Sequence, residues 1–493
     1  MSGTGGIVVI GAGLGGLAAA MRLAGAGRDV TVVEARDVPG GCCGTASLDG
    51  YRFDTGPSVL TMPEVLADAF AAAGEDMESR LPLRRLDPYY RMRYHDGTHL
   101  DVVPGEDAMI EQVRALCGAA EADRYRRFRA RLGELFAAEW PAFIDRDMTR
   151  LRHLVRPLVL ARLAALGGFR RLDGLVRAHL TDERLVRAHT FQALYVGLSP
   201  QRALGIYAVI AHMDTVGGVF FPRHGGMHAI PQAMAAAAEK AGAQIRYGTR
   251  ALKVETGPHG VSAVLLDTGL DTGERLPARH VVVACDLPGA HDGLLPKAAG
   301  DWRLRRPRHS PSCVVLHVGL DRRLDGQAHH TLHFGREWRS TFSALAAGRP
   351  QPDPSLLVTY PATDTAAAPA GHATLTVLEP APNLHGGADW DRLAPKLEDR
   401  LLARMADLGY GDLAGRPRLR FDPPAWARLG HSAGTPFALD HRFSQTAWFR
   451  PAGAARRVPG LHFAGMHTAP GVGVPPVLIS GRLAAERILE SPR

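Results

Sequence analysis

The opening of the chain alternates short apolar runs with glycines and small residues. Residues 7–10 (Ile-Val-Val-Ile) form a continuous apolar run, which is typical of a buried parallel strand. The alanine-rich stretch 17–24 predicts a helix, and residues 30–33 predict a second strand that Glu34 ends. This order of strand, helix and strand predicts a Rossmann-type unit in an α/β fold.

Glycines fill the turn between the first strand and the helix. Gly11 allows a tight turn, Gly13 lets the backbone approach a pyrophosphate, and Gly16 permits close packing of helix on strand. The free N–H groups and partial positive charge of the helix N-terminus favour phosphate. Glu34 can accept hydrogen bonds from ribose hydroxyls, and its charge disfavours a 2′-phosphate, hence NADP. These residues predict a dinucleotide site.

Later patterns predict further elements. A helix is expected over 229–241, a pair of strands over 244–255, a buried strand over 280–285, and a helix over 475–489 with Pro475 in its first turn. Residues 66–215 are predicted to be mostly helical. Residues 300–450 contain strand patterns at 312–319 and 355–360 and a helical pattern at 391–408.

Composition narrows the class of protein. The 493 residues are 46% hydrophobic and 22% charged, which indicates a globular chain of two or three domains. The net charge of +8 comes mainly from arginine; it reflects either a GC-rich genome or attraction to an anionic surface. Because no nucleic-acid-binding motif occurs, lipid is the expected surface.

Cysteines and apolar stretches limit the site and the location. The five cysteines, at positions 42, 43, 117, 285 and 313, match neither a disulfide framework nor a metal-ligand spacing. No secretory signal is visible, and prolines break the charge-free stretch 458–481, so no transmembrane helix is expected. We therefore expect a cytoplasmic protein without a bound metal.

Several segments resemble the flavin amine oxidase superfamily, and most closely its bacterial-type phytoene desaturases (carotenoid and retinoid oxidoreductases). Residues 34–41 (Glu-Ala-Arg-Asp-Val-Pro-Gly-Gly) are similar to the motif that follows the second strand in that superfamily. The segments 51–59, 220–227, 328–331, 443–451 and 461–475 resemble phytoene desaturase motifs in the same order. The resemblance covers nearly the whole chain and implies FAD as the cofactor.

The glycine fingerprint and the resemblance together predict the cofactor site. In the superfamily, the residues matching Glu34 and Arg36 contact the adenosine half, and the residue matching Val254 makes a backbone contact to adenine. The predicted FAD-binding residues are Gly11, Ala12, Gly13, Gly15, Gly16, Glu34, Ala35, Arg36, Gly40, Gly41, Cys42, Gly56, Pro57, Ser58, Val59, Val254, Gly465, Met466, Gly473 and Val474.

Three positions depart from the family pattern. Cys42 stands where family members carry an arginine, Ala469 where they carry a histidine, and Met466 where the superfamily has an acidic residue. The loss of the arginine removes a cation from the neighbourhood of the pyrophosphate or the flavin. Contacts at these positions are expected to differ from those of relatives.

The resemblance also implies a domain plan. A doubly wound FAD-binding domain of the GR2-like type is assembled from residues 1–65, 222–295 and 455–493. Residues 66–221 form a helical region that contacts substrate and membrane, and residues 296–454 form a substrate-binding sheet with helices. The inserted substrate domain is thus expected to be α+β.

Residues 146–187 combine arginines with leucines at helical spacing, including Leu151, Leu154 and Leu158. Such a basic amphipathic segment can lie on an anionic membrane, and it can equally be a solvated helix face. Because the substrate implied by the resemblance resides in the bilayer, we expect a peripheral protein on the inner face of the cell membrane.

The implied activity is FAD-dependent desaturation of a carotenoid-type isoprenoid, most simply phytoene, with hydride transfer to flavin N5. Oxygen and quinone are both open as electron acceptors. Asp214 is the candidate polar group near the substrate, with a surface or capping carboxylate as the alternative. His329 and His330 are interpreted as structural, whereas His467 lies beside the predicted flavin and is either a contact there or a packed histidine. Two other functions remain open: a related oxidase, oxygenase or isomerase of another polyene or terpenoid, and a non-catalytic prenyl-lipid carrier.

Overall fold

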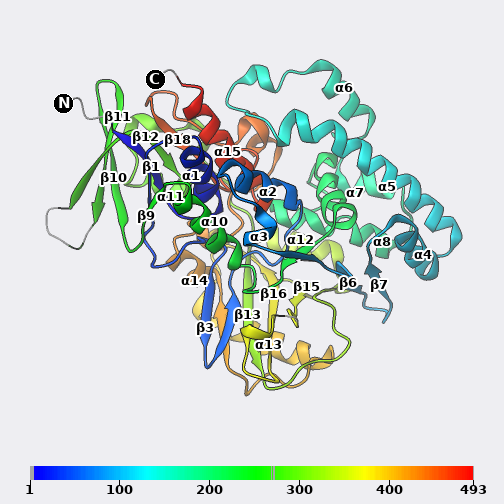
Figure 1. The fold of residues 1–493 in the computed structure, drawn as a ribbon. Coiled ribbons are helices and arrows are strands. Elements are labelled where there is room, and N and C mark those ends of the chain that lie inside the picture. Colours follow the sequence, from blue (N-terminus) through cyan, green and yellow to red (C-terminus); the bar gives the residue numbers. More distant parts are fainter. Residues whose placement is uncertain (1–4, 268, 270–272, 363, 492–493) are drawn as a thin grey trace.

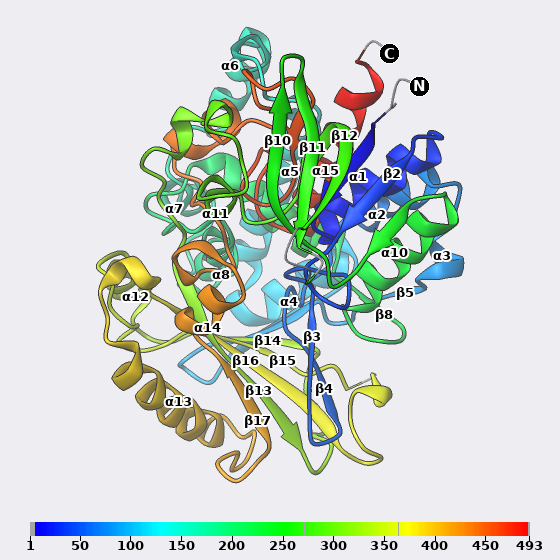
Figure 2. The same ribbon diagram turned by 90° about the vertical axis from the view of Figure 1, so that its left-hand side faces the viewer.

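Two large β-sheets organise the chain, and helices surround them. The computed structural model describes residues 5–267, 269, 273–362 and 364–491. Figures 1 and 2 show one sheet with the helices that flank it, a second sheet below it, and a lobe of helices to one side.

The first sheet gathers strands from three distant parts of the chain. Its order is β10-β11-β12-β1-β2-β9, and β18 also pairs with β12. The strands are β1 (Gly6–Ile10), β2 (Val30–Val33), β9 (Gln244–Arg246), β10 (Arg250–Gly257), β11 (Gly260–Asp267), β12 (Glu274–Val283) and β18 (Leu461–Phe463). Pairing is parallel among β1, β2, β9, β12 and β18. It is antiparallel between β10 and β11 and between β11 and β12.

The two strands expected over 244–255 exist, but they do not pair with each other. β9 lies parallel to β2, and β10 forms an antiparallel pair with β11. The turn at residues 247–249 separates two strands that extend to opposite edges of the sheet. Local sequence predicts the strands, whereas their partners come from other parts of the chain.

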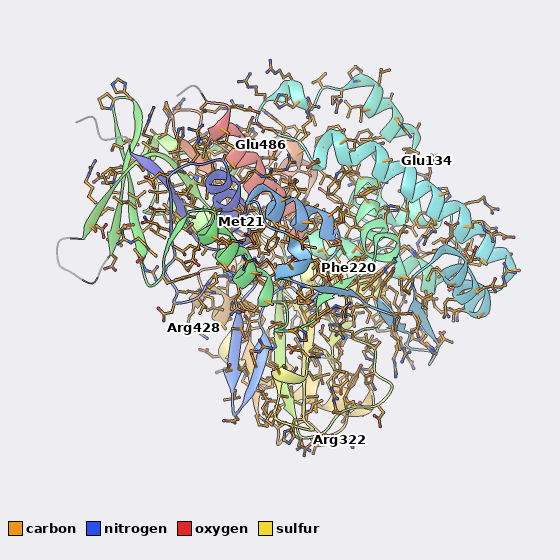
Figure 3. All side chains as sticks on the ribbon, in the orientation of Figure 1. Met21, Glu134, Phe220, Arg322, Arg428 and Glu486 are labelled. Atoms are coloured by element: carbon orange, nitrogen blue, oxygen red, sulfur yellow. The ribbon has the colours of Figure 1, made fainter. Side chains whose placement is uncertain are left out.

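Helix α1 (Leu14–Gly25) is almost wholly buried and packs against α2 (Pro63–Ala72), α10 (Ala229–Lys240) and α15 (Val474–Leu489). Met21 of α1 is fully enclosed (Figure 3). The helices α1 and α15 approach so closely that a Cβ at Gly481 would lie 2.2 Å from the Gly15 carbonyl oxygen. The helices predicted at 17–24, 229–241 and 475–489 are therefore present, and α1 begins three residues earlier than expected.

The second sheet has the order β17-β13-β16-β15-β14-β6-β7. Its strands are β6 (Tyr90–Arg93), β7 (His99–Val102), β13 (Ser312–Leu320), β14 (His330–His333), β15 (Leu356–Thr359), β16 (Ala373–Ala381) and β17 (Arg418–Phe421). Helix α13 (Trp390–Asp407) covers one face and buries Leu397, Leu401 and Met405 against it. The hairpin of β3 (Thr45–Leu48) and β4 (Tyr51–Asp54) descends beside this sheet (Figure 2).

The region 66–221 is not purely helical. It contributes β6 and β7 to the second sheet, and its strand β5 (Leu83–Arg85) pairs with β8 (Phe220–Pro222). In β6, buried Tyr90 and Met92 alternate with less buried Arg91 and Arg93. The period of two is correct for a strand, but a run of four residues is too short to stand out in an arginine-rich segment.

A helical lobe follows. It comprises α4 (Glu106–Cys117), α5 (Ala119–Glu139), α6 (Pro157–Ala165), α7 (Leu172–Arg177), α8 (Glu183–Ala188) and α9 (Ala208–His212), with π-helical turns at Trp140–Ile144 and Met213–Gly217. Shorter helices elsewhere are α3 (Met77–Arg80), α11 (Leu287–His291), α12 (Trp338–Ala346) and α14 (Pro423–Arg428). Within the described ranges, no helix has the length and apolar character needed to cross a bilayer.

Candidate functional site

A cavity of about 1080 Å³ extends through the molecule, at the upper end of the usual range for ligand sites. Its wall includes the carboxyl end of β1, the N-terminal ends of α1 and α15, the residues after β12, and side chains of the second sheet and the helical lobe. One continuous space thus joins the glycine-rich turn to a chamber lined largely by apolar side chains.

The turn between β1 and α1 has the geometry that its glycines predict. Gly11 has a φ of +103°, a conformation that other residues rarely adopt. A Cβ on Gly16 would lie 2.0 Å from the Gly11 carbonyl oxygen, so only glycine permits this contact between helix and turn. Gly13 caps α1 and borders the cavity, where the nearest atom to an added Cβ is 3.9 Å away. The predicted roles of Gly11 and Gly16 agree with this geometry.

The N-terminus of α1 opens to the cavity without a side chain to cap it. Its first-turn N–H groups and the helix dipole offer a ready site for a phosphate. Gly41, at a φ of +56°, faces Gly13 across this space. The residues present therefore fit the pyrophosphate of a flavin nucleotide.

Glu34, directly after β2, is buried and orders the turn. Its Oε2 accepts a hydrogen bond from the Ala12 N–H at 2.7 Å, and its Oε1 accepts one from the Arg36 N–H at 2.9 Å. Because each carboxylate oxygen has a further lone pair, Glu34 can still accept from a ribose hydroxyl. Arg36 donates to the Gly41 carbonyl at 2.9 Å and so connects the strand end to the glycine pair.

Cys42, which stands in place of the arginine of related sequences, contacts a histidine. Its Sγ lies 3.8 Å from Nε2 of His431. Burial raises the pKa of Cys42 to about 12, so the group is a neutral thiol and supplies no charge. Burial also lowers the pKa of His431 to about 4, which leaves its ring uncharged.

Most of the predicted cofactor residues line this one cavity: Gly11, Gly13, Gly15, Glu34, Ala35, Arg36, Gly40, Gly41, Cys42, Gly56, Pro57, Ser58, Val59, Gly465, Met466, Gly473 and Val474. Ala12 and Gly16 lie just behind the wall. Val254 does not reach the wall: its side chain is in the core, and its N–H donates to the Leu294 carbonyl at 2.8 Å. Arg250 and Ala251, earlier on β10, line the cavity instead.

An acidic residue that sequence reasoning did not identify also lines the cavity. Asp286 follows β12, and its Oδ1 lies 2.9 Å from Nε2 of His467. Burial raises its pKa, but hydrogen bonds from His467, Ser432 and the Gly289 N–H outweigh burial, so the pKa falls below its ordinary value and Asp286 is ionised. Its place at the carboxyl end of a predicted parallel strand was the signal that could have revealed it.

Asp214, the predicted polar group near the substrate, lies in the π-helical turn Met213–Gly217 and lines the chamber. It is only 2% exposed, and its Oδ1 is 3.5 Å from Nε2 of Gln192. Burial raises its pKa well above the ordinary value, which favours the neutral carboxylic acid. It is not a surface carboxylate.

His329 and His330 pack among aromatic rings. The ring of His329 is centred 4.4 Å from that of Phe221, and Nδ1 of His330 lies 3.2 Å from Oγ1 of Thr359. Burial lowers the pKa of both histidines, so both are neutral. These contacts agree with the structural role expected for them.

A second acidic residue of the chamber was also missed. Glu139, the last residue of α5, lines the cavity, and burial raises its pKa well above the ordinary value. It continues the apolar stripe that Phe128, Leu132 and Leu135 form on α5. A glutamate in line with the apolar residues of a helix was the sequence signal that could have revealed this acid.

Comparison with known proteins places the chain among flavoproteins. Residues 14–489 match the family described as flavin containing amine oxidoreductase. A phytoene dehydrogenase from Streptomyces griseus is 49% identical, over 98% of this chain and 94% of that protein. A zeta-carotene-forming phytoene desaturase from Myxococcus xanthus is 37% identical, over 98% and 93%.

Solved structures share the fold at low sequence identity. An oxidoreductase from Methanosarcina mazei superposes with a TM-score of 0.62 at 17% identity, covering 98% of this chain and 100% of that one. Cyclohexylamine oxidase from Brevibacterium oxydans gives 0.58 at 16% identity, with 99% of both chains covered. With the family match and the full-length relatives, these likenesses show that the chain belongs to the flavin-containing amine oxidoreductase family, within the group of phytoene dehydrogenases and desaturases.

Proposed function

We propose that the protein is an FAD-dependent desaturase of a carotenoid-type isoprenoid, with phytoene as the simplest substrate. The observation that carries the proposal is the continuous cavity between the glycine cradle and the apolar chamber. A redox cofactor held at the cradle and a long hydrocarbon in the chamber would share one water-poor space. The relatives named phytoene dehydrogenase and phytoene desaturase support this substrate class.

The protein's own residues would bind the cofactor and orient it. The uncapped N-terminus of α1 would hold the pyrophosphate of FAD, and Glu34 and Arg36 lie at the adenosine side. Helix α15 begins with Val474 at the cavity, so the positive end of its dipole would favour negative charge on a flavin held there. Bound FAD supplies the hydride acceptor of the reaction.

The chamber aligns the hydrocarbon and excludes water. Its wall includes Phe191, Leu332 and Phe334, whose side chains have no polar groups. Exclusion of water and correct alignment are the main requirements for hydride removal from an allylic carbon. Asp214, whose pKa is raised by burial, is the polar group that we assign to the reacting part of the isoprenoid chain.

We further propose that the protein lies on the inner face of the cell membrane. A basic apolar patch lies on the helical lobe. It consists of the exposed apolar residues Leu151, Val155, Leu158 and Phe169 and the exposed arginines Arg150, Arg152, Arg162, Arg170 and Arg171. Phe169 also lines the cavity, so the chamber reaches the surface within this patch. A lipid-soluble substrate could then enter from the bilayer.

The decisive experiment is anaerobic incubation of FAD-loaded protein with phytoene in liposomes. The expected result is bleaching of the flavin absorption together with a product that has lost two hydrogens. Flavin that stays oxidised while phytoene binds would instead support a prenyl-lipid carrier. A product with moved double bonds and no loss of hydrogen would identify an isomerase.

The same reduced sample identifies the electron acceptor. Oxygen and a quinone in the liposomes are the two proposed acceptors. Each is added separately to the bleached protein, and the rate at which flavin absorption returns is measured. The faster acceptor at equal concentration is the one that supports turnover.

A further inference from the structure

Glu139 lies where an amphipathic helix presents its apolar face. On α5 the residues Tyr125, Phe128, Leu132 and Leu135 are all buried, and Glu139 continues the same stripe. The π-helical turn Trp140–Ile144 follows directly. The glutamate is 6% exposed and lines the chamber.

The carboxyl group has no partner that would explain its burial. Its Oε2 is enclosed and lacks a hydrogen bond to any residue that the structure describes. Burial is the one cause of its raised pKa, without any compensating cation. Tyr207, which also lines the cavity, has its hydroxyl hydrogen-bonded to Thr446 and to the His441 carbonyl. Burial favours the protonated form of Glu139, in which the carboxyl group can both donate and accept a hydrogen bond.

The nearby cavity wall is apolar. It is formed by Phe143, Ile144, Leu163, Phe169, Ile206 and Ile210. A buried polar group that lacks a partner destabilises the protein, so its presence in such a wall indicates that something else satisfies it. Oδ1 of Asp214, the other buried acid of the chamber, has Nε2 of Gln192 beside it, but its Oδ2, like Oε2 of Glu139, lacks a hydrogen bond to any described residue.

The chemistry of the group selects its ligand. Burial opposes ionisation, which disfavours a cationic ligand, and a neutral acid gives little attraction to an anion. An alcohol both donates and accepts, so it can pair with a carboxylic acid whether the acid presents its O–H donor or its acceptor oxygen. A ketone or quinone carbonyl can only accept, and a hydrocarbon does neither.

We propose that Glu139 is a specificity-determining residue that binds a hydroxyl group carried by an isoprenoid. The inference rests on the proposed function, because it takes the chamber to be the binding site of an isoprenoid chain. It adds a substrate class: besides hydrocarbons, the chamber accepts hydroxylated isoprenoids and prefers them to hydrocarbons of equal length.

The test compares two probes that differ in one group: geranylgeraniol and the hydrocarbon of the same carbon skeleton without the hydroxyl. Both are added to full-length, FAD-loaded protein in liposomes, and their binding is followed by the change in flavin fluorescence. We expect the wild-type protein to bind the alcohol about tenfold more tightly, the effect of one hydrogen bond to a neutral partner. Equal affinity for the two probes would overturn the proposal.

Variants separate recognition of the hydroxyl from general packing. Glu139→Leu should bring the ratio of affinities to about one, while Glu139→Gln, whose amide also donates and accepts, should keep a preference. Glu134→Gln, on the exposed side of the same helix (Figure 3), is the matched control and should leave the ratio unchanged. A preference for the alcohol that survives in Glu139→Leu would show that another group binds the hydroxyl.

Two outcomes distinguish this inference from the proposed function. Failure to desaturate phytoene would overturn the proposed function, yet the affinities of the two probes can still be compared. Normal phytoene turnover with equal binding of both probes would overturn only the proposal that Glu139 binds a hydroxyl group. If Glu139→Leu does not fold, the wild-type ratio and Glu139→Gln still decide the question.

Discussion

At the scale of single residues, the site depends on a few backbone positions that accept no side chain. Gly16 lies against the Gly11 carbonyl, and Gly56 lies against that of Cys42, where an added Cβ would be 1.8 Å from the oxygen. Both contacts are between backbone atoms, so neighbouring side chains cannot move aside to relieve them. The shape of the cradle is thus fixed by close backbone contacts at positions that accept only glycine.

We expect Gly16→Ala to abolish flavin binding. The new methyl group would push α1 away from the turn and cost about 1–3 kcal/mol of folding free energy by overpacking. Flavin content of the purified protein and the urea midpoint measure the two effects. Gly174→Ala, at a helical position with open space around it, is the control and should keep both at wild-type values.

Asp214→Leu should lower the rate of phytoene desaturation about tenfold, by loss of a hydrogen bond in the chamber. Asp214→Asn keeps the shape and a polar group, so it should retain most of the rate. Because Asp214 lies outside the glycine cradle, both variants should bind FAD normally. A wild-type rate in Asp214→Leu would remove this residue from the proposed mechanism.

Sequence reasoning succeeds for the glycines and fails for the acids of the chamber. The roles of Gly11 and Gly16 follow from local backbone geometry, which a short motif encodes. Glu139 and Asp286 acquire their roles from distant parts of the chain: Glu139 lines a cavity to which many separate segments contribute, and Asp286 is hydrogen-bonded to His467. Tertiary packing creates these contacts, so no local sequence pattern predicts them.

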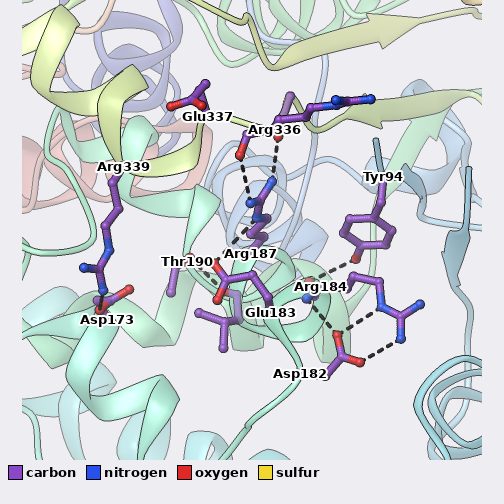
Figure 4. Close-up of polar contacts among 12 residues, drawn as sticks. Tyr94, Asp173, Asp182, Glu183, Arg184, Arg187, Thr190, Arg336, Glu337 and Arg339 are labelled. Carbon is purple, nitrogen blue, oxygen red and sulfur yellow. Dashed lines mark hydrogen bonds and ion pairs between the residues drawn. The ribbon is translucent and has the colours of Figure 1, made fainter. Parts of the chain in front are cut away.

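At the scale of elements, a buried arginine ties the helical lobe to the second sheet. Arg187 of α8 donates to the carbonyls of Gly335 and Arg336, at 2.6 and 3.1 Å, beyond the end of β14 (Figure 4). Its guanidinium also lies over the ring of Trp338. This one side chain therefore joins two parts of the fold that are about 150 residues apart in sequence.

We expect Arg187→Ala to destabilise the fold by about 2–4 kcal/mol, because it removes charge-assisted hydrogen bonds and leaves two carbonyls without donors. Chemical denaturation gives the change in free energy of unfolding. Arg339→Ala supplies a control from the same region (Figure 4), since Arg339 is 69% exposed and lies 3.9 Å from Asp173. That exposed pair should contribute about 0.5 kcal/mol or less.

Element prediction was most accurate for the longer helices and for short strands without charged residues. The helices α1, α10 and α15 and the strands β1 and β2 lie where the apolar pattern places them, within a few residues. The strands β6 and β7 were missed because four-residue runs with arginines give little signal. The partners of β9 and β10 also escaped prediction, since strand pairing depends on the whole sheet.

At the scale of the whole molecule, the basic apolar patch lies on the helical lobe, whose helix α6 projects at the outer edge of the molecule (Figure 1). Leu158 is 87% exposed and Val155 is 61% exposed, so neither contributes much to the core. Exposed apolar groups together with arginines would bind the surface of an anionic bilayer.

The double substitution Val155→Ser with Leu158→Ser should reduce binding to anionic vesicles at least fivefold, because both apolar anchors are lost. Co-sedimentation with vesicles measures the bound fraction. Leu252→Ser, on a strand of the nucleotide-binding sheet, removes an exposed leucine elsewhere and should leave binding intact. Undiminished binding of the double variant would show that the protein docks through another face.

Buried neutral histidines make stability depend on pH. Burial lowers the pKa of His317, His330 and His462 to about 3, against an ordinary value of 6.5. The unfolded chain therefore binds more protons than the folded chain between these values. Stability should be full above about pH 6.5 and fall as the pH drops below it, by about 1.4 kcal/mol per pH unit for each such histidine.

Urea unfolding at a series of pH values tests this expectation. His462→Phe should lessen the slope below about pH 6.5 by close to one proton, because the ring no longer titrates. His259→Gln, at an exposed turn, should leave the slope unchanged. An unchanged slope in His462→Phe would mean that its ring is already protonated in the folded protein.

The last strand and helix, β18 and α15, complete the first sheet and the wall of the cavity. During synthesis the first sheet therefore stays incomplete until β18 and α15 have left the ribosome. Until then the face of α1 around Gly15, which packs against Gly481, is uncovered. The apolar chamber must stay shielded from aggregation for the duration of synthesis. Loss of even the final helix should consequently yield insoluble, colourless protein rather than a weakened enzyme.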